Sequence, residues 1–204
     1  QLGVQDFELS IPSQQIRLKE SLSVNVAAAG RTDFGAENRL DTATLSVQAG
    51  QDRIDARLLQ PVLDFKQGGT WALDLKIQGQ LAQWLPRLRP WIALDDWNPA
   101  GSYVLTVQGT GSAELIDVRR AQLSVQQFRV QGHGLCVQEP KLELVATGRW
   151  DQKTGRLDLK QATLTGTNLS VRADNVVYAP PGEAPGTLAA TVAYQMSVDR
   201  LQQW

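Results

Sequence analysis

The chain has 204 residues with 20 lysines and arginines against 21 aspartates and glutamates, so its formal net charge is −1. No block of like charge occurs, and this argues against nucleic acid as a partner, because phosphate binding needs a concentrated basic surface. No apolar run approaches the roughly 18 residues that a membrane-spanning helix requires, so we expect no transmembrane span within this sequence. A single cysteine excludes an intrachain disulfide and a thiolate metal cluster.

Alternation of apolar and polar residues with period two dominates from the N-terminus onward and predicts β-strands. In the segment 71–77, Trp-Ala-Leu-Asp-Leu-Lys-Ile, large apolar residues occupy the odd positions while Asp74 and Lys76 face the other way. Glycine-rich and proline-rich turn signals separate such segments. We therefore expect an all-β fold, an antiparallel, curved and twisted meander of repeated units that forms either an open trough or a sandwich.

Several predicted strands change parity midway without a turn residue. The pattern Leu-x-x-Ala-x-Leu occurs in looser form over 40–45, with valine first over 118–123, and over 159–164. A change of inward-facing parity within one strand is typical of a β-bulge, which bends the strand and increases its twist. We therefore predict a bulge at the same place in each unit.

One segment departs from the β pattern. Over residues 80–91, Leu81, Trp84, Leu85, Leu88 and Trp91 follow one another at three-residue and four-residue steps, which predicts a short helical segment. Two prolines in this segment prevent one uninterrupted helix. We expect Trp84 and Trp91 to cap one open end of the core.

The sequence contains an internal repeat. Residues 30–84 recur over 148–204, and the matched positions include Arg39-Leu40-Asp41 with Arg156-Leu157-Asp158 and Ala43-Thr44-Leu45 with Ala162-Thr163-Leu164. Such self-similarity is typical of extended repeat architectures. We divide the chain into a first β repeat unit, 1–84, and a second, continuous unit, 85–204. Because the second copy stops where the first continues into a new strand, we expect the chain to be a fragment of a larger protein.

Candidate catalytic groups are sparse. His133 and Cys136 are the only histidine and cysteine, and we expect them on opposite faces of one strand. One of each provides neither a three-group catalytic arrangement nor four zinc ligands. Asp95 and Asp96 beside Trp97 are a candidate carboxylate–aromatic site, although this stretch is also typical of a turn. We expect no catalytic residue, no metal, no cofactor and no enzymatic activity.

Scattered basic residues offer a further, weaker candidate for anion binding. Arg119 and Arg120 are adjacent on a predicted strand, and Arg87, Arg89 and Lys76 lie elsewhere in the chain. We interpret them as solvated charges that discourage association between sheets.

A sheet with one apolar face must bury that face against something, either a second sheet of the same chain or a ligand. We expect the apolar residues of the predicted strands to line one continuous interior that could bind a ligand. These residues are Leu73, Leu75, Ile77, Leu105, Val107, Leu123, Leu142, Leu144, Val192 and Tyr194.

The sequence resembles the AsmA-like and TamB-like envelope proteins of bacteria with outer membranes in three features: the β meander with a glycine turn, the Leu-x-hydrophobic-x-x-Ala-x-Leu run, and the short Leu/Trp/Pro-rich helical segment at 81–91. The resemblance implies long sheets that curl into an open apolar trough for lipid acyl chains. It also implies a periplasmic or cell-envelope location, with an inner-membrane anchor outside this sequence. The chain departs from that pattern in its many inward threonines and alanines and its six tryptophans.

From the alternation and the resemblance we expect a non-catalytic segment of a large cell-envelope protein that handles lipid for transport or outer-membrane biogenesis. Its partners would be lipid or other envelope proteins. The alternative is a closed β-sandwich with a structural or protein-interaction role, because the sequence alternation is the same in both cases.

Overall fold

The computed structural model of the chain describes residues 2–11, 16–32, 38–63, 69–83, 97–181 and 186–197, with side chains described from residue 22 onward except for residue 32. Trp84 and Trp91, the predicted end-capping aromatics, lie outside these ranges, as do Asp95, Asp96, Arg87 and Arg89.

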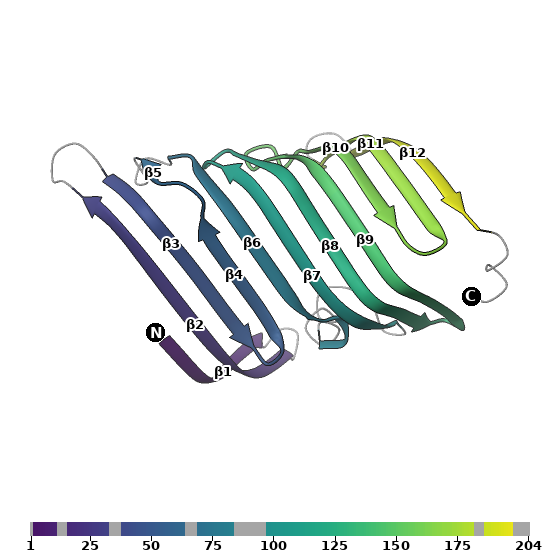
Figure 1. Cartoon of the computed structure of the whole chain (residues 1–204), viewed down its shortest axis with the longest axis horizontal. Coiled ribbons are helices and arrows are strands. Elements are labelled where there is room, and N and C mark those ends of the chain that lie inside the picture. Colours follow the sequence, from purple (N-terminus) through teal and green to yellow (C-terminus); the bar gives the residue numbers. More distant parts are fainter. Residues whose placement is uncertain are drawn as a thin grey trace.

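The described residues form one antiparallel sheet of twelve strands, as the alternation predicted. Eleven strands follow one another in chain order across the sheet, and the short β5 pairs with β3 beside this path. Figure 1 shows them side by side in a single twisted layer, with β1 and β12 at opposite ends. The strands are β1 (Leu2–Ile11), β2 (Ile16–Thr32), β3 (Asn38–Ala49), β4 (Asp52–Leu58), β5 (Val62–Leu63), β6 (Trp71–Gln80), β7 (Asn98–Gly111), β8 (Leu115–Gly132), β9 (Leu135–Asp151), β10 (Leu157–Thr165), β11 (Leu169–Ala179) and β12 (Thr187–Met196).

The predicted bulges are confirmed at all three Leu-x-x-Ala-x-Leu patterns. In each case the register shifts by one residue, which leaves one residue without a directly opposed partner: Asp41 against β2, Arg119 against β7 and Lys160 against β9. A bulge reverses the parity of the residues that follow it. The apolar residues before and after the bulge differ in parity and therefore lie on the same face of the sheet.

A glycine lies opposite the start of each bulge. Gly30 pairs with Leu40, Gly109 with Val118 and Gly148 with Leu159. In all three positions an added Cβ would collide with a backbone carbonyl of the bulged strand, namely that of Arg39, Asp117 and Asp158 respectively. The absence of a side chain is therefore required for the bulged strand to approach this closely.

The internal repeat has a counterpart in the order of the strands. The series β2, β3, β4, β6 corresponds to β9, β10, β11, β12, with the bulge between the first two strands of each series. One detail of the sequence alignment was wrong. Because Gly30 pairs with Leu40 and Gly148 with Leu159, Leu40 corresponds to Leu159 and not to Leu157.

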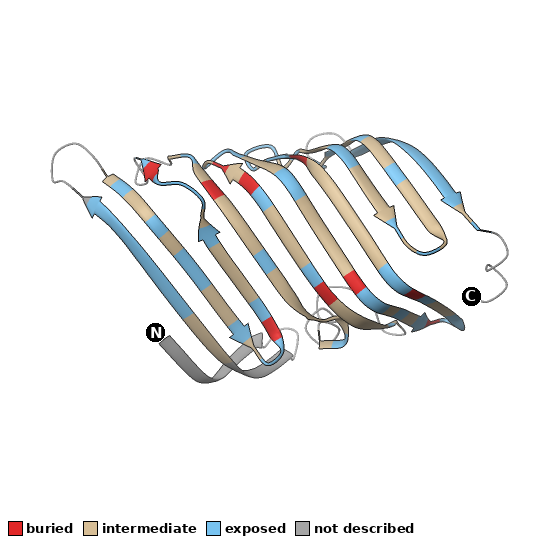
Figure 2. Ribbon diagram, viewed as in Figure 1, coloured by how far each residue is buried: buried red, intermediate tan, exposed pale blue. Residues whose placement is uncertain are grey.

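The sheet is open, and the described residues contain no second sheet that would close a sandwich. Only four hydrophobic residues in this part of the chain are buried, namely Val62, Ala72, Tyr103 and Val125. Figure 2 accordingly shows the strands from β3 to β12 mostly as partly or fully exposed. Of the two predicted forms, the described sheet is the open one.

The helical prediction is confirmed for a single turn at residues 81–83, directly after β6. The remainder of the predicted segment lies outside the described residues. Within the described ranges, no helix combines the length and the apolar character needed to cross a membrane.

Candidate functional site

The most prominent feature of the sheet is a row of large apolar side chains that crosses ten strands without interruption. Residues directly opposite each other in an antiparallel pair point to the same face, so the printed register places this whole row on one side. From β2 to β12 the row consists of Val24, Val47, Ile54, Ile77, Leu105, Leu123, Leu144, Leu164, Val171 and Tyr194.

A second apolar row runs beside the first on the same face, two residues away along each strand. From β8 to β11 it consists of alanines, so its side chains are shorter than those of the neighbouring row. It comprises Val26, Leu45, Ala56, Leu75, Val107, Ala121, Ala146, Ala162, Ala173 and Val192. We call the side of the sheet that carries these two rows the apolar face.

All ten residues of the predicted interior lie on the apolar face. Eight belong to the two rows, and Leu73 and Leu142 lie just beyond them, opposite Gly109 and Val125. Leu144, in the middle of the sheet, is half-buried by its neighbours within the layer. At the β12 end Val192 is 57% and Tyr194 is 77% exposed, so the face stays accessible up to the edge. Their role in ligand binding remains a prediction.

Aromatic residues line one margin of the apolar face. Trp71 pairs with Gly111, and the same cross-strand row continues through Ile116 to Trp150 on β9, then through Leu157 to Tyr178 on β11. An added Cβ at Gly111 would lie 2.6 Å from Trp71 Cε2, so the indole ring covers this glycine. Trp150 and Tyr178 are exposed. Rings with one apolar part and one polar atom suit such a boundary.

The apolar face is hollowed beside β3, β4 and β6. A depression of about 810 Å³ is lined mainly by apolar side chains, among them Leu40, Leu58, Val62, Trp71 and Leu73. It lies where β4 ends and β5 moves to pair with β3 opposite Leu40. Its volume falls within the range of about 300 to 1,000 Å³ that small-molecule pockets occupy.

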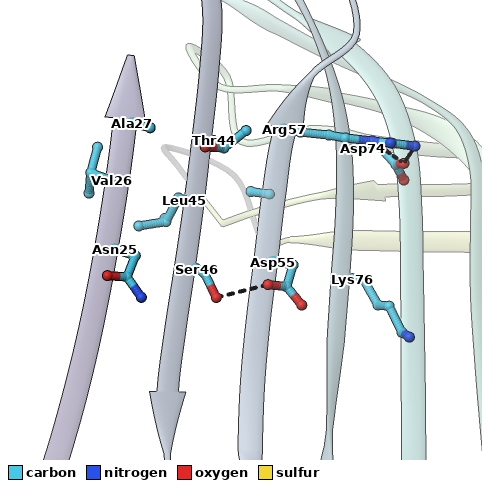
Figure 3. Close-up of a pocket in the computed structure, with 11 residues that line it drawn as sticks. Asn25, Val26, Ala27, Thr44, Leu45, Ser46, Asp55, Arg57, Asp74 and Lys76 are labelled. Carbon is cyan, nitrogen blue, oxygen red and sulfur yellow. Dashed lines mark hydrogen bonds and ion pairs between the residues drawn. The ribbon is translucent and has the colours of Figure 1, made fainter. Parts of the chain in front are cut away.

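The opposite face of the sheet is polar, and its side chains form cross-strand rows of their own. Figure 3 shows Asn25, Ser46, Asp55 and Lys76 in one such row on four neighbouring strands. They line an open depression of about 600 Å³. Ser46 Oγ donates a hydrogen bond to Asp55 Oδ1 at 2.9 Å. The Arg53 guanidinium, which hydrogen-bonds the same carboxylate, is the main cause that lowers the pKa of Asp55.

Charged side chains of the polar face form ion pairs that are exposed to solvent. Arg57 Nη2 lies 2.6 Å from Asp74 Oδ2 across the β4–β6 pair, and Arg172 Nε lies 2.8 Å from Asp174 Oδ2 within β11. Exposed ion pairs of this kind contribute little to stability, because solvent screens them. The polar face therefore resembles an ordinary solvated surface.

Two carboxylates are buried at the margins of the sheet. Asp52 Oδ1 accepts a hydrogen bond from the Gln80 backbone N–H at 3.2 Å, just before the helical turn, and a Cβ on Gly79 would collide with it. Glu139 Oε2 accepts a hydrogen bond from the Thr167 backbone N–H at 2.9 Å in the turn between β10 and β11. Both side chains therefore hold turns against neighbouring strands.

The structure changes one detail of the histidine and cysteine interpretation. His133 and Gly134 form the two-residue turn between β8 and β9, with positive φ angles of 49° and 78°, whereas Cys136 lies in β9. His133 is therefore a turn residue, whereas the sequence had led us to predict a strand residue. Its ring lies 5.4 Å from that of Trp97 in an edge-to-face arrangement. In the described part of the chain, no cluster of three or more His, Cys, Asp or Glu side chains could hold a metal ion.

The alanine row and the aromatic margin were not predicted from the sequence. Alanine carries little hydrophobic signal, so Ala121, Ala146 and Ala162 were not selected although they alternate correctly. Trp150 was also not selected, although it continues the alternation of Leu144 and Ala146 along β9. The alternation along each strand contained the signal needed to place both groups on the apolar face.

Comparison of the chain with protein-family models, with curated proteins and with solved structures gave no match.

Proposed function

We propose that this chain is a non-catalytic segment that binds lipid acyl chains on its apolar face. The observation that carries the proposal is the pair of apolar rows that cross ten strands with no second layer of described residues over them. The resemblance to AsmA-like and TamB-like proteins supports the same function.

The size of the apolar face supports a ligand-binding role. Ten strands spaced about 4.8 Å apart span about 43 Å, and two rows about 7 Å apart cover about 600 Å². That is already the upper end of what a typical soluble monomer exposes as one patch, and the outer apolar residues add to it. At roughly 25 cal/mol per Å² of apolar surface, covering this face is strongly favourable.

The chemistry of the face favours an acyl chain over a polar ligand. Both complete rows are aliphatic except for Tyr194 at the edge, and neither contains a charged side chain. Such a surface recognises apolar material without demanding defined hydrogen bonds. The Trp71 and Trp150 rings at one margin would meet the polar end of a bound lipid, as amphipathic aromatics do at membrane interfaces.

The proposal extends to the biological setting that the resemblance implies. A segment that carries acyl chains on an open sheet would serve lipid transport or outer-membrane biogenesis in the periplasm, and its partners would be lipids and other envelope proteins.

A matched pair of variants on β7 tests the proposal. Leu105 lies on the apolar face between Ile77 and Leu123, whereas its neighbour Thr106 lies on the polar face between Lys76 and Gln122. In a titration with a fluorescent long-chain fatty acid, Leu105→Gln should weaken binding about three- to tenfold, which corresponds to half of a leucine's burial energy. Thr106→Gln should leave the affinity unchanged.

Circular dichroism of both variants would establish that the sheet is retained. Equal affinity of the two variants, or no uptake of the fatty acid by the unaltered chain, would contradict the proposal.

A further inference from the structure

The outer side of β12 is an open sheet edge. Among the described residues no strand pairs with β12 except β11. Leu188 is 72% and Tyr194 77% exposed, and Figure 2 shows β12 exposed along almost its whole length. The backbone groups that point away from β11 are therefore available to another strand.

The sequence of β12 lacks the features that normally prevent an edge strand from pairing with another strand. Charged side chains, prolines and bulges on the edge strand prevent the addition of further strands. The ten residues of β12 contain no charge and no proline, and the register shift against β11 lies on β11, between Asp174 and Val177. The opposite edge differs, because β1 contains Asp6 and Glu8 and has its own bulge between Val4 and Phe7.

The internal repeat indicates what kind of strand fits this edge. Gly69-Thr70, directly before β6, matches Gly186-Thr187 at the start of β12, so Leu75 and Ile77 correspond to Val192 and Tyr194. In the first unit β6 is an inner strand whose outer side is paired with β7 over ten residues. β12 therefore occupies the position of a strand that has a partner in the other copy.

The backbone of β12 is oriented in the same way as that of β6. Ser197 N–H donates to the Asn168 carbonyl at 3.0 Å, so odd-numbered residues bond toward β11, and Val192 and Tyr194 direct their backbone groups outward. In β6 the Ala72 carbonyl accepts from Leu59 N–H, so even-numbered residues bond toward β4 and the odd-numbered ones toward β7. The backbone groups of Val192 and Tyr194 thus point away from the preceding strand, as those of Leu75 and Ile77 do.

We propose that the β12 edge binds an antiparallel β-strand. This strand would be uncharged and would alternate like β7, so that its apolar side chains lie on the apolar face. In the register of the first unit, the residue in the place of Val107 would pair with Val192, and that in the place of Leu105 with Tyr194. The partner is a polypeptide strand bound through its backbone, which is a binding mode separate from acyl-chain binding.

A synthetic peptide with the sequence of residues 98–111 provides the probe. Backbone groups of Leu105 and Val107 face β6 in the structure, so N-methylation at these two positions blocks the binding edge. N-methylation at Val104 and Thr106 blocks only the other edge and is the matched control. Hydrogen exchange of the Val192 and Tyr194 amides should slow at least about tenfold with the unmethylated and control peptides, and not with the blocked peptide.

Protection of these amides by none of the peptides, or equally by all three, would overturn the proposal. Protection without peptide that rises with protein concentration would also overturn it, because it would show two copies of this chain pairing through β12.

Discussion

Gly148 lies directly opposite Leu159 in the β9–β10 pair, so close that an added Cβ would fall 2.8 Å from Leu159 Cα and onto the Asp158 carbonyl. The same relationship holds between Gly30 and Leu40 and between Gly109 and Val118. Each glycine permits a bulge, and each bulge keeps the apolar side chains of a long strand on one face. The apolar face therefore depends on three residues that contribute no side chain to it.

Gly148→Ala should destabilise the sheet by about 1 to 3 kcal/mol, the usual cost of forcing extra atoms into a packed position. The colliding atoms belong to the backbone and cannot rotate away. Chemical denaturation would measure the loss. Gly134→Asn is the control, because nothing lies within 4 Å of that position and asparagine tolerates its φ of 78°. Equal stability of the two variants would contradict the bulge account.

Asp52→Ala should lower stability by about 1 kcal/mol, because the Gln80 N–H loses its side-chain acceptor at the start of the helical turn. Asp52→Asn keeps an oxygen in the same place and should retain most of the stability. Thermal unfolding followed by circular dichroism would compare them. An Asp52→Ala melting temperature equal to that of the unaltered chain would show that this contact does not stabilise the turn.

Acid should remove the contribution of Asp158 to the stability of the folded state. Its hydrogen bond with Arg156, followed by the charges of Arg156 and Arg149, lowers the pKa of Asp158 below the ordinary value of 3.8. A lowered pKa in the folded state stabilises that state above pH 3.8, and the effect is lost as the pH falls through the folded value.

The difference in melting temperature between the unaltered chain and Asp158→Asn should therefore shrink as the pH falls below 3.8, and added salt should reduce it at neutral pH. A difference that persists undiminished in acid would show that this ion pair is not its source.

Much of the fold could be predicted because the period of a strand is short and local. The alternation at Leu73, Leu75 and Ile77 identified a strand and its apolar side without knowledge of its neighbours. The change of parity between Leu159 and Ala162 likewise identified a bulge, since no other local device moves an apolar set to the opposite parity within one strand.

What the sequence did not determine is how the strands align with one another. Leu40 corresponds to Leu159 because both lie opposite a glycine. The Leu-x-x-Ala-x-Leu pattern over 40–45 and 159–164 agrees with this alignment, whereas the match of Arg39-Leu40-Asp41 with Arg156-Leu157-Asp158 pointed to Leu157. His133 was assigned to a strand although glycines flank it on both sides, and in the structure it forms a two-residue turn with Gly134. The open form could not be predicted, because alternation is identical whether a second sheet, a ligand or solvent covers the apolar face.

The central claim is that the apolar face binds lipid, and native mass spectrometry of gently purified protein tests it most directly. We predict species heavier than the 22.4 kDa chain by the mass of one or more phospholipids, or uptake of added phospholipid by the bare chain. Detection of the 22.4 kDa species alone, before and after incubation with phospholipid, would contradict the claim.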